Sequence, residues 1–177
     1  MKTLKTLSML LLVVFTSNLL KAQVSGLGIA TSTYPTKTID YIYYTDDDRF
    51  PVSSINNGLS SGTYDITADN NPLHCPSSAN INNFNAGDQV LVIQMWGGTI
   101  GTHYNATVNT NIANVLNITP VVSTTNWSLF STSNPDDRIQ IIKIPQYYNL
   151  LVDGGIVTCA KWDGYTGGIL CVQVAGN

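Results

Sequence analysis

The chain has 177 residues, of which only 11% are charged, and it carries 8 basic against 11 acidic side chains. This balance argues against nucleic acid or an anionic membrane surface as a partner, because both need clustered Lys and Arg. Every acidic residue is Asp, and Asn, Ser, Thr, Gly and Tyr are abundant. Such a composition is typical of an extracellular, β-rich surface.

The N-terminus has the three parts of a secretory signal peptide. Lys2 and Lys5 give a positive start, residues 7–15 form an apolar run, and Ala22 offers a cleavage point. The run is shorter than the roughly 20 residues that span a bilayer, so a retained anchor is the less favoured alternative. We expect residues 1–22 to be removed and the protein to be secreted or held at the cell surface, without membrane insertion.

Removal of residues 1–22 leaves 155 residues, about the size of one domain. Three of the eight basic residues are lost with this segment, so the formal net charge of the remainder is −6. Residues 23–40 are rich in Gly, Ser and Thr and are expected to be a flexible lead-in. Residues 41–177 are expected to form one β-rich module, whose strongest pattern lies in residues 84–177.

The first half of this module has a weak β pattern. Residues 39–43 alternate between apolar and polar side chains and predict a strand before the acidic turn at residues 46–48. Residues 53–83 are dense in turn formers, and we expect only one short strand there, at residues 63–67.

A stronger β pattern begins after the turn signal at residues 85–88. Residues 89–96 form an apolar run rich in β-branched side chains, and residues 138–144 form another that a proline ends. Between them, "ANVLNITPVV" and "WSLF" predict short strands, with a weak helical alternative in "TNIANVLNI". Three more apolar runs complete the chain. The succession predicts an all-β fold, a short-strand sandwich or barrel-like module, with a solenoid as a further alternative.

Three segments follow one another along the chain: "FNAGDQVLVIQMWGGTI", "RIQIIKIPQYYNLLVDG" and "AKWDGYTGGILCVQVAGN". Together they resemble a module near the N-termini of large exported surface proteins of Bacteroidetes. That family includes gliding-motility and adhesin-like proteins, many of which use type IX secretion. The resemblance covers residues 84–177, and Cys159 and Cys171 depart from it, since hydrophobic or small residues are usual there.

The resemblance implies a structural or adhesive function at the cell surface. It also implies that the last segment is the entrance to a longer, β-helix-like stretch, so that this chain would be a module truncated at its C-terminus. The expected partners are a surface polysaccharide or another cell-surface protein, and no nucleic acid.

Three cysteines follow the leader, and in an exported protein the default is one disulfide with one cysteine left over. Cys159 and Cys171 lie in two apolar runs that flank one turn, so hairpin pairing could bring them face to face. The alternative is two small buried hydrophobic side chains that do not bond. Cys75 would be the cysteine left over.

The chain offers little for catalysis or metal binding. His74 and Cys75 are adjacent in a loop and point to opposite faces, and with His103 they have no recognised zinc spacing. We expect no catalytic residue, no enzyme activity, no metal and no cofactor. Weak calcium binding is an alternative for the loop aspartates of "TDDDR", "DITADNN" and "NPDDR", which we interpret as solvated acidic turns.

The aromatic side chains are the remaining candidates for binding. Trp96, Trp127, Trp162 and Tyr165 could form a platform on which a sugar stacks while Asp163 bonds its hydroxyls. The alternative is that the rings cover the ends of a β core and that "AKWDGYTGG" is a structural corner, which the family resemblance favours. The sequence therefore predicts a non-catalytic structural or adhesion-type module, with a carbohydrate-binding module as the alternative.

Overall fold

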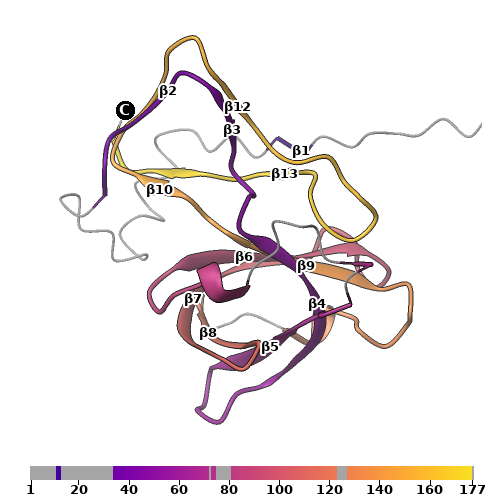
Figure 1. Cartoon of the computed structure of the whole chain (residues 1–177). Coiled ribbons are helices and arrows are strands. Elements are labelled where there is room, and N and C mark those ends of the chain that lie inside the picture. The colour runs from indigo at the N-terminus through magenta and orange to yellow at the C-terminus, as the bar shows by residue number, and fades with distance from the viewer. Residues whose placement is uncertain (1–10, 13–33, 72, 75–80, 123–126, 177) are drawn as a thin grey trace, which may run out of the picture.

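A computed structural model describes residues 11–12, 34–71, 73–74, 81–122 and 127–176. These residues form short strands and two 3-10 helices, which confirms the predicted all-β class. They build two regions, a closed barrel and a layer of short parallel strands on one side of it (Figure 1). Within the described residues, no helix has the length and apolar character needed to cross a membrane.

Six antiparallel strands close into the barrel in the order β4-β5-β8-β7-β6-β9. Strand β9 completes the closure because it pairs with both β4 and β6. Closure leaves none of the six with an unpaired edge, which stabilises short strands that would be marginal in an open sheet. Their bounds are β4 Arg49–Asn57, β5 Tyr64–Ala68, β6 Gln89–Trp96, β7 His103–Ile112, β8 Val115–Pro120 and β9 Arg138–Lys143.

Apolar side chains from alternate strand positions fill the barrel interior. Two 3-10 helices, η1 (Ile81–Asn83) and η2 (Trp127–Leu129), add side chains to this core. The rings of Phe50 and Phe84 meet edge to face, with centroids 5.0 Å apart. The core comprises Phe50, Val52, Ile66, Ala68, Ile81, Phe84, Val90, Val92, Ala106, Val108, Leu116, Ile118, Trp127, Ile139 and Ile141.

Strands β6 and β9 are buried on both faces, which explains their continuous apolar sequences. Their outward-facing Ile93 and Ile142 pack against Ile169 of the parallel layer. Strands β7 and β8 face outward with polar side chains instead, and the Asn109 amide donates to the Asn117 side-chain oxygen at 2.8 Å. A strand with one wet face alternates, and a strand covered on both faces does not.

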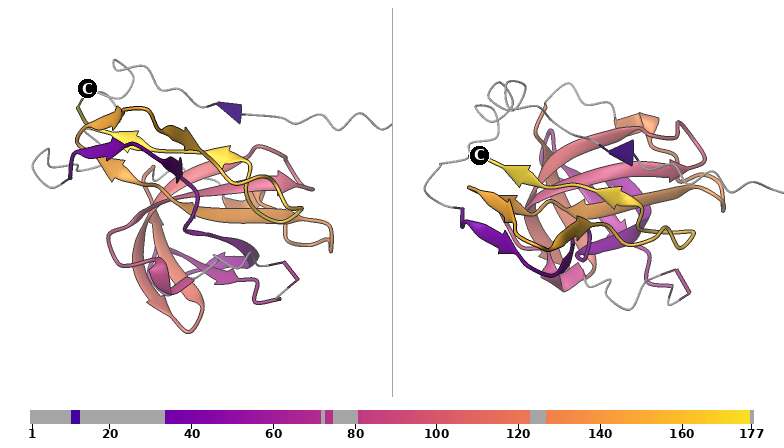
Figure 2. Two further views of the ribbon diagram at one scale, coloured as in Figure 1. Left: turned by 45° about the horizontal axis from the view of Figure 1, so that its top comes forward. Right: turned by 90° about the horizontal axis from the view of Figure 1, so that it is seen from above.

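The second region consists of short strands that pair only in parallel. Strand β2 pairs with β11, β3 with β12, and β10 with β14. Figure 2 shows these segments running alongside one another on one side of the barrel. A further pair joins β13 to β1 (Leu11–Leu12), which lies in the predicted signal peptide. The remaining bounds are β2 Lys37–Ile39, β3 Ile42–Tyr44, β10 Gln146–Tyr147, β11 Leu150–Val152, β12 Ile156–Thr158, β13 Ile169–Leu170 and β14 Gln173–Val174.

Several expected boundaries are corrected. Residues 53–57, expected to lie among turns, continue β4, because their ladder with β5 stabilises a polar sequence. The "WSLF" segment contains helix η2 rather than a strand, and the helical alternative at residues 110–118 is wrong, since these residues belong mainly to β7 and β8. The strands expected at residues 63–67, 89–96 and 138–144 are confirmed within one residue.

The expected organisation also changes. The barrel takes β4 and β5 from before residue 84, so the segment with the strongest pattern, residues 84–177, supplies four of its six strands. Residues 37–39 of the expected flexible lead-in form β2, held by β11. The rest of the predicted signal peptide, most of the lead-in and Cys75 lie outside the described residues.

Candidate functional site

The barrel and the parallel layer meet at a buried ion pair. Asp46 and Arg49 are 0% and 5% exposed, and their charged groups lie 3.8 Å apart. Arg49 also donates to the backbone oxygen of Asp46 at 2.7 Å and to the Thr166 hydroxyl at 3.3 Å. The backbone N–H of Ala160 donates to Asp46 at 2.8 Å, which ties the layer to the same carboxylate. The interpretation of "TDDDR" as a solvated acidic turn is therefore wrong for Asp46, which is buried.

Burial raises the pKa of Asp46 above its ordinary value of 3.8, although the Ala160 N–H and Arg49 act in the opposite direction. One carboxylate oxygen of Asp46, Oδ2, is buried and has no hydrogen-bond partner among the described residues. A proton on that oxygen would remove a buried charge, which Arg49 compensates in the ionised state. The junction therefore favours the protonated form more than solvent does.

The disulfide expected between Cys159 and Cys171 is not formed, and both thiols are free. The hairpin assumed for it does not exist, because β12 pairs with β3 while β13 pairs with β1. Burial raises the pKa of Cys171 to about 12, with further contributions from Asp46 and Cys159. Burial also raises the pKa of Cys159. Both thiols therefore stay protonated and are weak nucleophiles at neutral pH.

The "AKWDGYTGG" segment is a corner fixed by its own hydrogen bonds. The carboxylate of Asp163 accepts the backbone N–H groups of Tyr165 and Thr166 at 2.8 and 2.7 Å. Gln140 of β9 clamps Gly167 through both backbone groups, at 2.9 and 3.0 Å. The φ angle of Gly167 is 92°, a region that favours glycine. These contacts agree with a structural corner and leave Asp163 engaged in the turn.

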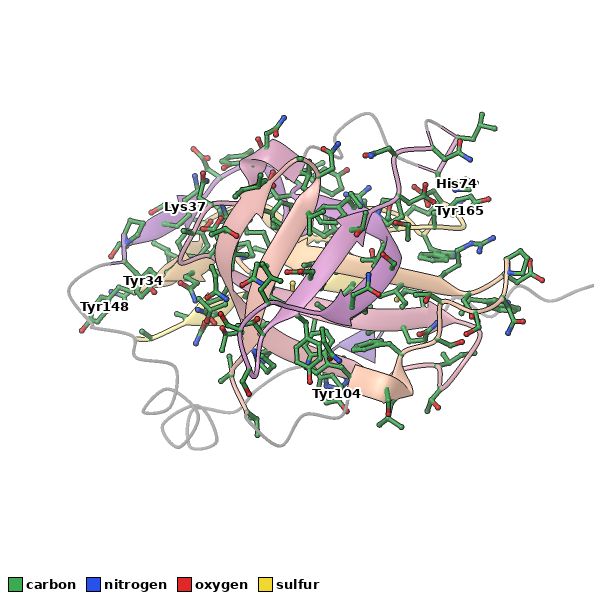
Figure 3. All side chains as sticks on the ribbon, turned by 90° about the horizontal axis from the view of Figure 1, so that it is seen from below. Tyr34, Lys37, His74, Tyr104, Tyr148 and Tyr165 are labelled. Carbon is green, nitrogen blue, oxygen red and sulfur yellow. The ribbon has the colours of Figure 1, made fainter. Side chains whose placement is uncertain are left out.

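Tyr165 lies at a polar cleft of about 230 Å³ between this corner and the barrel loops. Its ring stacks on His74 with centroids 3.9 Å apart, and the guanidinium of Arg138 lies 4.5 Å from the ring centroid. The Nδ1 atom of His74 is 2.7 Å from a carboxylate oxygen of Asp69. Figure 3 shows His74 and Tyr165 together at the edge of the molecule. The ring of Tyr165 thus joins two loops instead of standing free for a ligand.

The three tryptophans expected to form a binding platform have separate environments. Trp127 is 5% exposed and stacks on Tyr64 with centroids 4.8 Å apart, so its expected role at the surface is wrong. Its ring belongs to the barrel core. Trp96 at the end of β6 is 60% exposed, and Trp162 in the corner is half-buried.

The remaining polar candidates are engaged in local contacts. Asp137 accepts the Ser131 hydroxyl at 2.7 Å, a bond that lowers the pKa of this carboxyl. Nδ1 of His103 lies 2.8 Å from the carbonyl oxygen of Gly101. In the part of the chain that the structure describes, no group of three or more His, Cys, Asp or Glu side chains is placed to hold a metal ion.

The parallel layer carries a cluster of exposed apolar side chains. The barrel exposes such residues singly at its loops and strand ends, whereas the layer exposes them on neighbouring strands and corners. Ile42 and Ile156 are Cα partners in one ladder and are both more than half exposed. Exposed apolar clusters of this kind mark interaction surfaces. The exposed apolar residues of the layer are Tyr41, Ile42, Tyr44, Tyr148, Leu151, Val152 and Ile156.

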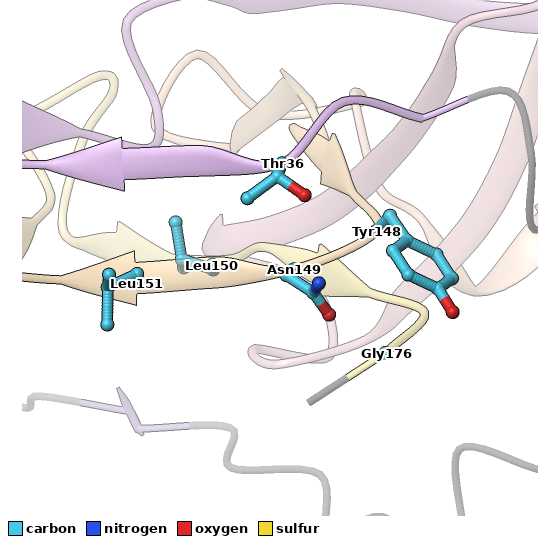
Figure 4. Close-up of a pocket in the computed structure, with 6 residues that line it drawn as sticks. All are labelled: Thr36, Tyr148, Asn149, Leu150, Leu151 and Gly176. Carbon is cyan, nitrogen blue, oxygen red and sulfur yellow. The ribbon is translucent and has the colours of Figure 1, made fainter.

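An open hollow of about 750 Å³ lies beside these side chains, next to the start of β11. Figure 4 shows it between the ends of β10 and β11 and the backbone at Gly176. It is lined by Thr36, Tyr148, Asn149, Leu150, Leu151 and Gly176. The hollow gives access to the side of β11 that does not pair with β2. We take this side of β11, together with the corresponding side of β12, as the candidate functional site.

Sequence reasoning did not find this site. The layer brings together residues more than 100 positions apart, as between Thr38 and Leu151. The one local signal is a shared pattern, because "TIDYIYYT" and "LLVDGGIVT" both place an Asp before an Ile. The stack of His74 on Tyr165 has no sequence signal at all, since a loop contact across 91 positions follows no period.

Comparison of the chain with protein-family models, with curated proteins and with solved structures finds no match.

Proposed function

We propose that this chain is a non-catalytic module of an exported bacterial cell-surface protein, with a structural and adhesive function. The carrying observation is the parallel layer. Its strands pair at offsets of 113 and 114 residues between β2–β3 and β11–β12, and of 27 residues between β10 and β14. In a β-solenoid the chain winds in successive turns, called coils, and the strands of one coil pair in parallel with those of the next, which gives an extended structure.

The contacts of the layer support this proposal. The Gln146 amide donates to the side-chain oxygen of Gln173 at 2.8 Å, so identical side chains stack from one coil to the next. The hydroxyls of Tyr43 and Tyr147 lie 2.7 Å apart and join two sides of the coil. The barrel is inserted between residues 45 and 146 and covers the layer on one side. The finer proposal is that the barrel caps a β-helix-like stretch.

Export and surface display test this proposal. The full chain with a C-terminal epitope tag is expressed in a Bacteroidetes host, and intact cells are treated with protease. We expect loss of the tag from intact cells. A Val13→Arg, Val14→Arg variant, which interrupts the apolar run of the leader, should keep the tag inside and protected. Tag protection in both proteins would contradict the proposal.

Carbohydrate binding is the second candidate, and the exposure of Trp96 favours it. A ring that is 60% exposed at a strand end can stack on a sugar. Retention of the protein on a column of surface polysaccharide should fall with Trp96→Ala and persist with Trp162→Ala. Equal retention of both variants would remove Trp96 from the site.

A further inference from the structure

We propose that the free side of β11 and β12 is a docking edge for one parallel strand, and that the strand it fits is one that extends β14 in the same direction and in the same 27-residue register. This inference rests on the proposed function, since it gives the module the surface through which it joins further β structure. Three independent observations support it: side-chain exposure, unpaired backbone groups and the course of β14.

The first observation is a difference between two neighbours in one ladder. Val152 is the Cα partner of Ile39 in the parallel pair of β11 with β2, so both side chains point to the same side. Ile39 is 0% exposed, whereas Val152 is 49% exposed. Ile39 is fully covered by its surroundings. Among the described residues, no strand pairs with the side of β11 that faces away from β2, so nothing of that kind covers Val152. An apolar side chain in an inward position is thus left half open to solvent.

The second observation concerns the backbone of the same strands. Lys37 N–H donates to Asn149 O and Asp153 N–H donates to Ile39 O, each at 2.9 Å. Because every second residue faces the same neighbour, Leu150 and Val152 turn their N–H and C=O groups to the other side.

Strand β12 repeats the arrangement. Ile156 N–H donates to Tyr41 O at 3.0 Å, and Thr45 N–H donates to Thr158 O at 2.9 Å. Val157, between Ile156 and Thr158, therefore faces away from β3. Within the described ranges no strand pairs with this side of β11 or β12. A row of unpaired groups is a template for one more strand.

The third observation identifies the occupant. Strand β14 already pairs with β10, and this ladder continues as Ala175 N–H donates to Tyr147 O at 2.9 Å and Gly176 N–H to Tyr148 O at 2.5 Å. The same 27-residue offset carries the next residues onto Leu150 and then along β11. The hollow next to Gly176 lies on this course (Figure 4).

A second copy of the chain is a poorer occupant. Neighbouring strands in a sheet lie about 4.8 Å apart. If β2 and β3 of one copy paired with β11 and β12 of another, each copy would add two strands to the stack. Successive copies would then lie about 10 Å apart. Each copy carries a barrel at residues 49–143, and two barrels do not fit within this spacing. A single strand in continuity with β14 meets no such obstacle.

Hydrogen exchange on the full chain gives the first test. The open-side amides of Leu150, Val152 and Val157 should exchange close to the unprotected rate. The amides of Asp153 and Ile156, which donate to β2–β3, should exchange at least tenfold more slowly. Equal protection of both sets would mean that the edge is already covered, and would overturn the proposal.

An added strand gives the second test. Eight residues that repeat residues 151–158 are appended after Asn177, which places them in the 27-residue register. We expect at least tenfold slower exchange at Val152 and Val157. A matched appendage with Pro in its third and eighth positions should give none. In a parallel ladder the N–H groups at these positions would donate to the carbonyl oxygens of Val152 and Val157, and Pro lacks the N–H.

Two controls make the outcome decisive. Protected amides at Ile66 and Ile118 of the barrel verify that each variant is folded. The same eight residues added as a free peptide at 1 mM, roughly the effective concentration of a linked segment, test an occupant from another molecule. Protection by the free peptide but not by the appended repeat would overturn the proposal. A lack of protection with the appended repeat would also overturn it. These outcomes are independent of export and surface display, so the failure of either proposal is recognisable by itself.

Discussion

The barrel and the parallel layer are both β structure, but different interactions hold them together. The barrel strands have 5 to 10 residues and close on themselves, and they enclose one continuous apolar core. The layer strands have only two or three residues, and several of its apolar side chains are exposed. Strands that short are not stable alone. The layer therefore depends on the barrel beneath it.

The barrel also brings the layer together. The chain enters and leaves it at adjacent points, where Lys143 N–H donates to Asp48 O at 2.9 Å. Pairing of β2 with β11 closes a loop of more than 100 residues, which costs conformational entropy in an unfolded chain. Once the barrel has folded, Asp48 and Lys143 are neighbours and that cost is largely removed. We expect the barrel to fold first.

The largest effect is expected in the barrel core. Phe50→Ala removes a ring that is 2% exposed and should lower the free energy of unfolding by about 3–5 kcal/mol. Urea unfolding measures it, and Ile156→Ala in the layer, at a side chain 56% exposed, is the control with an expected loss under about 1 kcal/mol. Similar losses in both variants would contradict the contrast between the two regions.

A comparable effect is expected at the junction. Arg49→Met leaves Asp46 buried without its cation and should cost about 3–5 kcal/mol. Arg49→Met combined with Asp46→Asn should recover part of this loss, because the uncompensated charge is removed. Urea unfolding of the three variants measures both changes, and no recovery in the double variant would show that the ion pair is not the cause.

The same junction predicts a pH dependence. The pKa of Asp46 is raised by burial, so the folded protein holds its proton more tightly than the unfolded chain. The resulting stability is complete below the ordinary pKa of 3.8 and is lost as the pH rises through the raised value in the folded state. Relative to Asp46→Asn, the native protein should lose stability with rising pH in this window. Parallel profiles of the two proteins would contradict the assignment.

A smaller effect is expected at the corner that anchors the layer. Gly167→Ala places a side chain at a φ of 92°, with its Cβ 2.6 Å from the Lys161 carbonyl oxygen, and should cost about 1–3 kcal/mol. Gly164→Ala is the matched control, since its φ is 106° but no atom lies within 4 Å of the added carbon. Exchange at residues 156–170 should rise more in Gly167→Ala. The reverse order would contradict the close approach.

The smallest effect is expected where the barrel loops meet the corner. A double-mutant cycle of His74→Ala and Tyr165→Leu should give a coupling of about 0.5–1.5 kcal/mol from the stacked rings. Thermal or urea unfolding of the four proteins measures it. Strict additivity of the two single changes would show that the stack contributes nothing to stability.

Strand patterns were readable where the environment is uniform along the strand. Residues 89–96 and 138–143 are covered on both faces, so their continuous apolar sequence identifies them. Strand β7 was missed because Asn and Thr fill its outward positions, and such residues also favour turns. The side chain of Trp127 could not be assigned to the core or the surface, because an amphipathic ring suits both.

The sequence by itself determined the β class, the strongest strands and the corner at residues 162–168, because alternation and turn chemistry are local properties. Only the tertiary structure decided that six strands close into a barrel, that Asp46 is buried, and that Cys159 and Cys171 do not share a hairpin. It also decided that residues 37–44 and 150–158 lie side by side. Pairing between distant strands is set by which backbone edges remain free after the barrel closes, and no periodicity in the sequence encodes that.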